Sequence, residues 1–172
     1  MGDGRLLDML ARSHPDAKFT GVETDASLCA QAKSLIPGNA KVANKKCEQL
    51  VPDLADDSID MFIAVLPDPS LIDRAGESKW KEFYQQLYAK LKPGGIFRLI
   101  TELTNELFEP IPDSVYQEWT QWLVSCFGSI GFEIMSQYEG SPSEYSSRCL
   151  EQFRGDPSRI RLVTLDLGKK QI

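Results

Sequence analysis

The sequence predicts a doubly wound α/β fold built on a mostly parallel sheet. Short apolar segments with strand character alternate along the chain with amphipathic segments of helical period. Gly, Pro, Asn and Asp residues stand at the joints between these segments. The 172 residues, 42% hydrophobic and 26% charged, match the size of one domain. We therefore expect a single domain over residues 1–172, without repeats or linkers.

The first third of the chain predicts helices alternating with short strands. The expected elements are a helix at 5–14, a strand at 18–23, a helix at 25–35, a strand at 40–43 and a helical turn at 46–54. Asp25 is a suitable N-cap for the second helix, and Pro37 and Gly38 end it.

The rest of the chain continues the alternation and closes with two strands. The expected elements are a strand at 58–66, a helix at 78–90, a turn at 93–95, a strand at 96–101, a helix at 113–130, and strands at 132–138 and 160–167. The strand at 58–66 carries no charge after Asp60, as expected of a strand buried on both faces. A long loop insertion with some helix, Glu139–Ser158, separates the last two strands, which we expect to form an antiparallel hairpin.

A glycine turn followed by a carboxylate indicates a nucleoside-binding site. Gly2, Asp3 and Gly4 open directly into a helix, where glycines let the backbone and its free N–H groups approach a ligand. Glu23 follows Gly4 by 19 residues, at the carboxyl end of a predicted strand, where it can accept hydrogen bonds from ribose hydroxyls. The alternative is a plain helix cap and an exposed carboxylate.

Four segments resemble the class I S-adenosylmethionine-dependent methyltransferases. They are, in chain order, GDGRLLDMLA, FTGVETD, DDSIDMFIAVLPDP and LKPGGIFRLITE. The resemblance implies a Rossmann-like methyltransferase sheet that binds S-adenosylmethionine. It also implies that Gly2, Asp3 and Gly4 line the cofactor and that Glu23 holds its ribose. The family's acidic residue for the adenine amine is expected near position 47, where Glu48 is the available carboxylate.

Within these methyltransferases, the chain is most similar to the bacterial tRNA (guanine-N7) methyltransferase family. The similarity lies in LPDP, in GVE, in LITE and in Leu150-Glu151-Gln152 before the last strand. It implies that Asp68 is the catalytic carboxylate and that Glu102 and Glu151 contact the target nucleotide. The residues also favour Asp68 independently, because a carboxylate between two prolines after a buried strand lies where open α/β sheets bind ligands. The alternative is an exposed Asp in a turn.

The chain also departs from that family. Ser70–Arg74 stands where the family has Trp and a basic cluster, and the chain begins inside the glycine motif. We therefore expect the fold to lack its first strand. Two alternatives to a tRNA methyltransferase stay open. One is a methyltransferase acting on a small molecule or protein, and the other is a non-catalytic methyltransferase-like scaffold with a degraded cofactor site.

Charge and cysteine usage limit the partners. The net charge of −6 supports tRNA only weakly as a partner, because phosphate contacts need clustered Lys and Arg. The four cysteines lie far apart beside a single His, so we expect no metal site, no disulfide and a reduced, cytoplasmic location. No apolar run approaches the roughly 20 residues of a membrane span. We expect a monomer or a homodimer.

Overall fold

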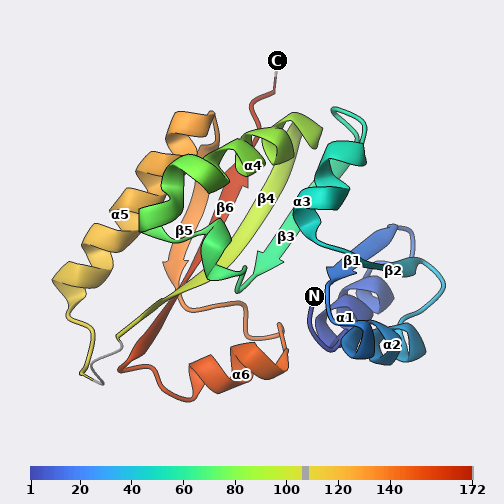
Figure 1. Cartoon of the computed structure of the whole chain (residues 1–172), viewed down its shortest axis with the longest axis horizontal. Coiled ribbons are helices and arrows are strands. Elements are labelled where there is room, and N and C mark those ends of the chain that lie inside the picture. The colour runs from blue at the N-terminus through green and yellow to red at the C-terminus, as the bar shows by residue number, and fades with distance from the viewer. Residues whose placement is uncertain (106–108, 172) are drawn as a thin grey trace. The chain divides into compact units, whose positions relative to one another are not determined.

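The computed structural model describes residues 1–105 and 109–171, which form two compact units. Unit 1 consists of Met1–Asp53 and Ser143–Glu151, and unit 2 consists of Leu54–Pro142 and Gln152–Ile172. Helices and strands alternate in both units, which confirms the predicted α/β class (Figure 1). The grouping of residues 1–172 into one domain stays a prediction.

Unit 1 is built on a parallel pair of short strands. Its elements are α1 (Arg5–Ser13), β1 (Phe19–Glu23), α2 (Ala26–Leu35), β2 (Ala40–Asn44) and α3 (Cys47–Leu50). Asp25 caps α2 as predicted, because its Oδ1 accepts hydrogen bonds from the backbone N–H groups of Ser27 and Leu28. β1 and β2 pair in parallel, so that Glu23 and Asn44 stand opposite each other at the carboxyl ends of both strands.

Unit 2 contains a four-stranded sheet with the order β3-β4-β6-β5. Its elements are β3 (Ile59–Val65), α4 (Glu77–Lys90), β4 (Leu91–Thr104), α5 (Asp113–Ile130), β5 (Glu133–Glu139) and β6 (Ile160–Gly168), and α6 (Arg148–Arg154) crosses the boundary between the units. β3 and β4 are parallel, whereas β6 pairs antiparallel with both β4 and β5. The predicted antiparallel closing hairpin is therefore confirmed.

One local prediction needs correction. The turn expected at 93–95 lies inside β4, where the register with β3 shifts between the Ile59–Leu91 and Met61–Ile96 pairs. The extra residues are accommodated as an irregularity of the strand, since Gly94 takes a φ of 77° and a side chain on Gly95 would come within 2.9 Å of a backbone carbonyl. The insertion expected at Glu139–Ser158, a loop with some helix, contains the helix α6.

Helices α4 and α5 cover one face of the four-stranded sheet (Figure 1). The side chains that form this core are fully or almost fully buried: Trp80, Tyr84, Phe97, Leu99, Leu123, Phe127, Leu165 and Leu167. Trp80 packs edge-on against Tyr84, and its indole Nε1 donates a 2.7 Å hydrogen bond to the carbonyl of Asp73. The core therefore anchors the loop that follows β3, which is the loop that carries Asp68.

Candidate cofactor and acceptor sites

The glycine turn of unit 1 requires glycine for two different reasons. Gly2 and Gly4 take φ values of 67° and 87°, a region that residues with a side chain rarely adopt. A Cβ at Gly4 would also lie 2.5 Å from the Cβ of Ala32, so glycine permits α2 to pack against the start of α1. A Cβ at Gly2 would meet nothing within 4 Å. The turn therefore leaves room beside Gly2 for a ligand to approach the backbone.

The carboxylate of Glu23 is held by backbone N–H groups. Its Oε2 accepts a 2.8 Å hydrogen bond from the N–H of Gly2, as the spacing of the glycine turn and the carboxylate predicted. Its Oε1 accepts hydrogen bonds from the N–H groups of Thr24 at 2.8 Å and Asp25 at 3.0 Å. Burial alone would raise the pKa of Glu23, but the hydrogen bonds from Asp25 and Gly2, the nearby amino group of Met1 and the hydrogen bond from Thr24 lower it overall.

This arrangement fits the ribose of S-adenosylmethionine. A carboxylate has about four acceptor positions, and the two backbone donors on Oε1 occupy two of them. Oε2 accepts one hydrogen bond from Gly2 and lies 3.5 Å from the amino group of Met1. Oε2 is therefore the atom that can take a ribose hydroxyl, and the lowered pKa keeps it ionised at neutral pH.

Arg5 contacts both Asp3, which was expected to line the cofactor, and Glu151, which was expected to contact the target nucleotide. Its Nε donates to Oδ2 of Asp3 at 2.8 Å, and its Nη1 lies 3.2 Å from Oε1 of Glu151. Ser146 donates a further short hydrogen bond to Glu151, and this bond together with the cation of Arg5 lowers the pKa of the Glu151 carboxyl despite the opposing effect of desolvation. Asp3 Oδ1 also accepts a 3.2 Å hydrogen bond from the N–H of Arg5, the first residue of α1.

Sequence reasoning missed Arg5 and Asn44. Arg5 directly follows the glycine turn, which is a signal that could have drawn attention to it. The Nδ2 of Asn44 donates to the carbonyls of Glu23 at 3.0 Å and Thr24 at 2.9 Å, a long-range contact without a sequence signature. Glu48, the predicted adenine ligand, is exposed in α3 and accepts a 3.0 Å hydrogen bond from Sγ of Cys47.

In unit 2, Asp68 begins a short turn of 3-10 helix at Pro69–Leu71. Its Oδ1 accepts hydrogen bonds from the N–H of Ser70 at 2.9 Å and from the hydroxyl of Ser70 at 2.6 Å. Leu66, two residues earlier, has a φ of 50°, which is uncommon for a bulky residue and more so for one that precedes proline. A 2.8 Å hydrogen bond from the Leu66 N–H to the carbonyl of Ile100 holds this conformation against β4.

Glu102 lies at the same edge of the sheet as Asp68. Val65 of β3 pairs with Ile100 of the parallel strand β4. Asp68 and Glu102 both come shortly after this pair in the sequence, so they lie at the carboxyl ends of neighbouring strands. Oε2 of Glu102 and the hydroxyl of Thr101 are buried and have no hydrogen-bond partner among residues 1–105 and 109–171. Burial disfavours the charged form and raises the pKa of Glu102 to about 7.

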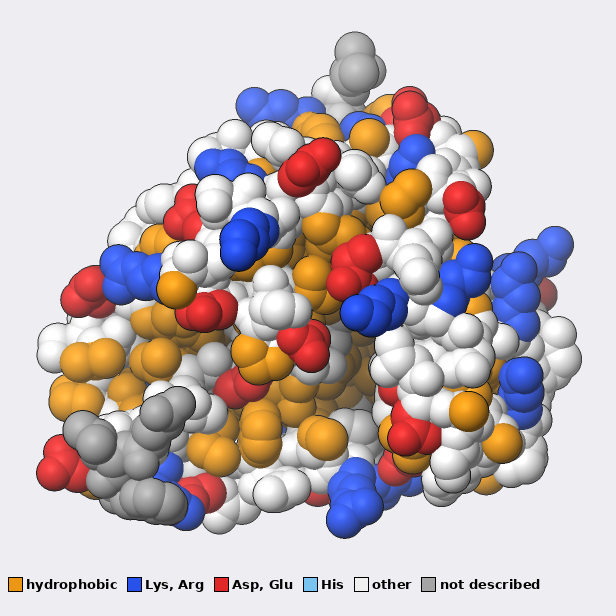
Figure 2. Space-filling view, viewed as in Figure 1, with side chains coloured by type: hydrophobic (Ala, Val, Ile, Leu, Met, Phe, Trp, Pro, Cys, Tyr) orange, Lys and Arg blue, Asp and Glu red, His pale blue; other side chains and the backbone are white. Residues whose placement is uncertain are grey.

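The described residues also bear on metal, membrane and disulfide features. Among them, no group of His, Cys, Asp and Glu side chains is arranged to hold a metal ion. Within the same residues, no helix is both long and apolar enough to cross a membrane. All four cysteines are described, and each is a free thiol. On the face drawn in Figure 2, Lys and Arg side chains are spread widely and lie next to Asp and Glu side chains in several places.

Comparison with known proteins identifies the relatives of this chain. A family described as "Methyltransferase domain" matches residues 1–95, more than half of the chain. The chain is also 29% identical, over 124 residues, to a tRNA (guanine-N(7)-)-methyltransferase of Acinetobacter baylyi. That match covers 69% of this chain and 46% of the relative, so the chain spans less than half the length of the curated relative that it matches.

Solved methyltransferase structures share the fold at low sequence identity. The 16S rRNA methyltransferase KamB matches with a TM-score of 0.74 and 20% identity, over 98% of this chain and 84% of that one. The 16S rRNA (adenine(1408)-N(1))-methyltransferase of Catenulisporales acidiphilia, solved with its cosubstrate SAM, matches with a TM-score of 0.69 and 15% identity, over 99% of this chain and 83% of that one. These likenesses establish the fold.

Proposed function

The chain belongs to the methyltransferase domain family, and from this premise we propose that it is an S-adenosylmethionine-dependent methyltransferase acting on guanine N7 of tRNA. The observation that carries the cofactor assignment is the ionised Glu23 carboxylate bound to the N–H of Gly2. The partial match to the Acinetobacter baylyi enzyme supports the guanine acceptor.

In unit 1, Glu23 and the glycine turn bind and orient the cofactor. Oε2 of Glu23 accepts a ribose hydroxyl, while the open space beside Gly2 admits the neighbouring part of the molecule. S-adenosylmethionine, when bound, would supply the methyl group of its sulfonium: the N–CH3 bond to guanine N7 would form as the S–CH3 bond breaks, and S-adenosylhomocysteine would leave. Such a reaction depends mainly on positioning, so it needs few residues that act chemically.

In unit 2, Asp68 and Glu102 orient the acceptor base. Guanine presents N–H donors on the edge opposite N7, and ionised carboxylates are acceptors only, so the two chemistries match. Methylation of N7 leaves a positive charge on the base, which nearby carboxylates stabilise electrostatically. Glu102 is especially suited to this role because its buried Oε2 has no hydrogen-bond partner among the described residues.

The test is transfer of a labelled methyl group from S-adenosylmethionine to tRNA lacking 7-methylguanosine, followed by nucleoside analysis. We expect label in 7-methylguanosine with the native chain and a loss of at least about 100-fold with Asp68→Ala. Asp73→Ala is the matched control, because Asp73 caps the next 3-10 turn of the same loop through the N–H of Ala75. Asp73→Ala should keep most of the activity. Label in another nucleoside, or equal losses of methyl transfer in Asp68→Ala and Asp73→Ala, would overturn the guanine assignment.

A methyltransferase of small molecules or proteins is the second candidate. The net charge of −6, together with Ser70–Arg74 in place of a basic cluster, favours an acceptor that carries no phosphate backbone. If the chain binds S-adenosylhomocysteine but leaves tRNA unlabelled, this candidate replaces the first. If the chain does not bind S-adenosylhomocysteine at all, the scaffold interpretation replaces both.

A further inference from the structure

We infer that Asn44 is a positioning residue for the cofactor: its side-chain amide fixes the two peptide groups whose N–H donors aim the carboxylate of Glu23. This inference rests on the proposed binding of the cofactor ribose by Glu23. It adds a function for a residue at the end of the neighbouring strand, whose side chain is exposed.

The geometry of the peptide groups links Asn44 to the carboxylate. The C=O of Glu23 and the N–H of Thr24 belong to one planar peptide group, and the C=O of Thr24 and the N–H of Asp25 belong to the next. Asn44 Nδ2 donates to both carbonyls, at 3.0 Å and 2.9 Å. Oε1 of Glu23 accepts from both N–H groups, at 2.8 Å and 3.0 Å. Each peptide group is therefore held on both sides, by Asn44 on one and Glu23 on the other.

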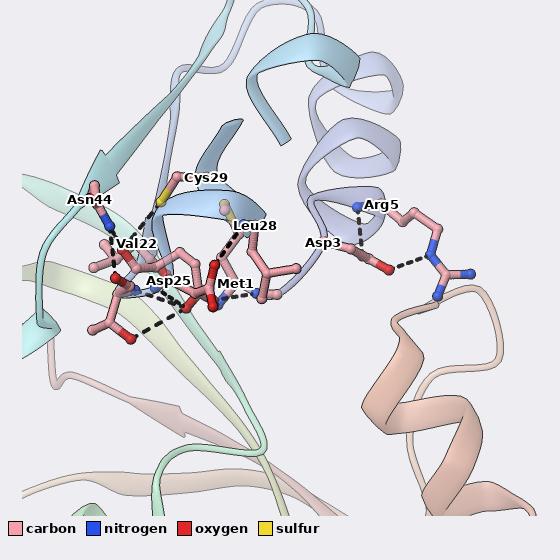
Figure 3. Close-up of polar contacts among 11 residues, drawn as sticks. Met1, Asp3, Arg5, Val22, Asp25, Leu28, Cys29 and Asn44 are labelled. Atoms are coloured by element: carbon pink, nitrogen blue, oxygen red, sulfur yellow. Dashed lines mark hydrogen bonds and ion pairs between the residues drawn. The ribbon is translucent and has the colours of Figure 1, made fainter. Parts of the chain in front are cut away.

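Neighbouring residues complete this arrangement (Figure 3). The thiol of Cys29 donates a 3.3 Å hydrogen bond to the carbonyl of Glu23, which Asn44 also contacts. The carboxylate of Asp25 caps α2 and fixes the following turn. Because a trans peptide group is rigid, a restraint on its carbonyl also fixes the direction of its N–H. Loss of the Asn44 amide should therefore let both N–H groups turn away from Glu23.

Asn39 provides a matched control at the opposite end of the same strand. Its Nδ2 donates to the carbonyls of Ala11, His14 and Ala17, at 2.9, 3.2 and 3.0 Å. Asn39 precedes β2, whereas Asn44 ends it. The two side chains thus make the same kind of contact, but only Asn44 touches the peptide groups that hold Glu23.

The experiment measures the dissociation constant of S-adenosylhomocysteine by calorimetry, together with urea unfolding. We expect Asn44→Ala to weaken binding at least about fivefold and Asn39→Ala to change it less than about twofold. In urea unfolding, Asn39→Ala should lose at least as much stability as Asn44→Ala. Asn44→Asp keeps the size of the side chain but removes the donor, and should weaken binding at least as much as Asn44→Ala. If Asn44→Ala does not fold, Asn44→Ser, which retains a shorter donor, is measured with the same expected direction.

The pH dependence of binding gives a second readout, which a purely structural function would not change. With its N–H donors misaligned, Glu23 should take up a proton at higher pH, so Asn44→Ala should lose binding at a higher pH than the native chain. Equal losses of affinity in Asn44→Ala and Asn39→Ala, with an unchanged pH dependence, would overturn this inference alone. A native chain that does not bind S-adenosylhomocysteine would overturn both this inference and the proposed function.

Discussion

Two glutamates, each near the carboxyl end of a parallel strand, have opposite electrostatic environments. Glu23 at the end of β1 accepts hydrogen bonds from three backbone N–H groups, which lower its pKa although burial opposes them. Glu102 near the end of β4 has a buried Oε2 without a hydrogen-bond partner among the described residues, and burial raises its pKa to about 7. Strand position alone therefore does not set the chemistry of a carboxylate. The two glutamates differ in their backbone donors: Gly2, Thr24 and Asp25 each donate an N–H to Glu23, whereas Oε2 of Glu102 accepts none from the described residues.

The largest expected effect is on cofactor binding when Glu23 is removed. Hydrogen bonds to charged groups contribute about 1.5–3 kcal/mol each, so Glu23→Ala should weaken binding of S-adenosylhomocysteine at least about tenfold. Glu23→Gln keeps an acceptor without the charge and should have a smaller effect. Calorimetry with both variants checks this difference. Binding by Glu23→Ala at native affinity would remove the distinction between the two glutamates.

The second effect concerns methyl transfer when Glu102 is made neutral. Glu102→Gln should lower transfer about tenfold while leaving S-adenosylhomocysteine affinity unchanged, because its proposed role is to hold the acceptor. Because the proposed role of Glu102 requires its ionised form, the native rate should rise with pH through about 7, and Glu102→Gln should lack this rise. Initial rates between pH 5.5 and 8.5 measure both effects, and identical profiles in the two proteins would contradict the assignment.

The third effect is on the pH dependence of stability. Burial raises the pKa of Glu102 from its ordinary value of 4.5 to about 7, so the folded chain holds this proton more tightly than the unfolded chain. Stability should therefore fall as pH rises from about 4.5 to about 7, by on the order of 1 kcal/mol once solvent screening is included. Glu102→Gln should remove this component and unfold at higher urea than the native chain at pH 8. Glu23 has the opposite effect because its pKa is lowered in the folded chain. Its ionised form stabilises the fold above about pH 4.5, and this stabilisation is lost as the pH falls further.

The smallest effect is expected when the exposed ion pair of Arg5 and Glu151 is broken. Glu151 is about half exposed, and its partner Arg5 is 42% exposed. Exposed ion pairs contribute little because water and salt screen them, so Arg5→Ala should change S-adenosylhomocysteine affinity less than about twofold. A larger loss, measured by the same calorimetry, would place Arg5 with Glu23 in the group that holds the cofactor.

The sequence predicted what depends on local pattern. The helix expected at 113–130 is observed as Asp113–Ile130 and ends at Gly131 with a φ of 119°, because amphipathic period and a C-terminal glycine act within the helix itself. The contact between the glycine turn and Glu23 followed from their spacing along a helix–strand unit.

Features that depend on contacts between distant residues were not predicted. The irregularity at Gly94 and Gly95 arises from pairing of β4 with β3, so the sequence indicated only a turn. The contact of Asn44 with Glu23 depends on the parallel register of β1 and β2. The raised pKa of Glu102 reflects burial, which a single strand pattern does not determine.

The measurement that tests the central claim most directly is a crystal structure of the chain with S-adenosylhomocysteine. It should place a ribose hydroxyl within about 3.2 Å of Oε2 of Glu23, beside the N–H of Gly2. Electron density for the ligand at any other position, with the Glu23 carboxylate contacting backbone donors alone, would contradict the account.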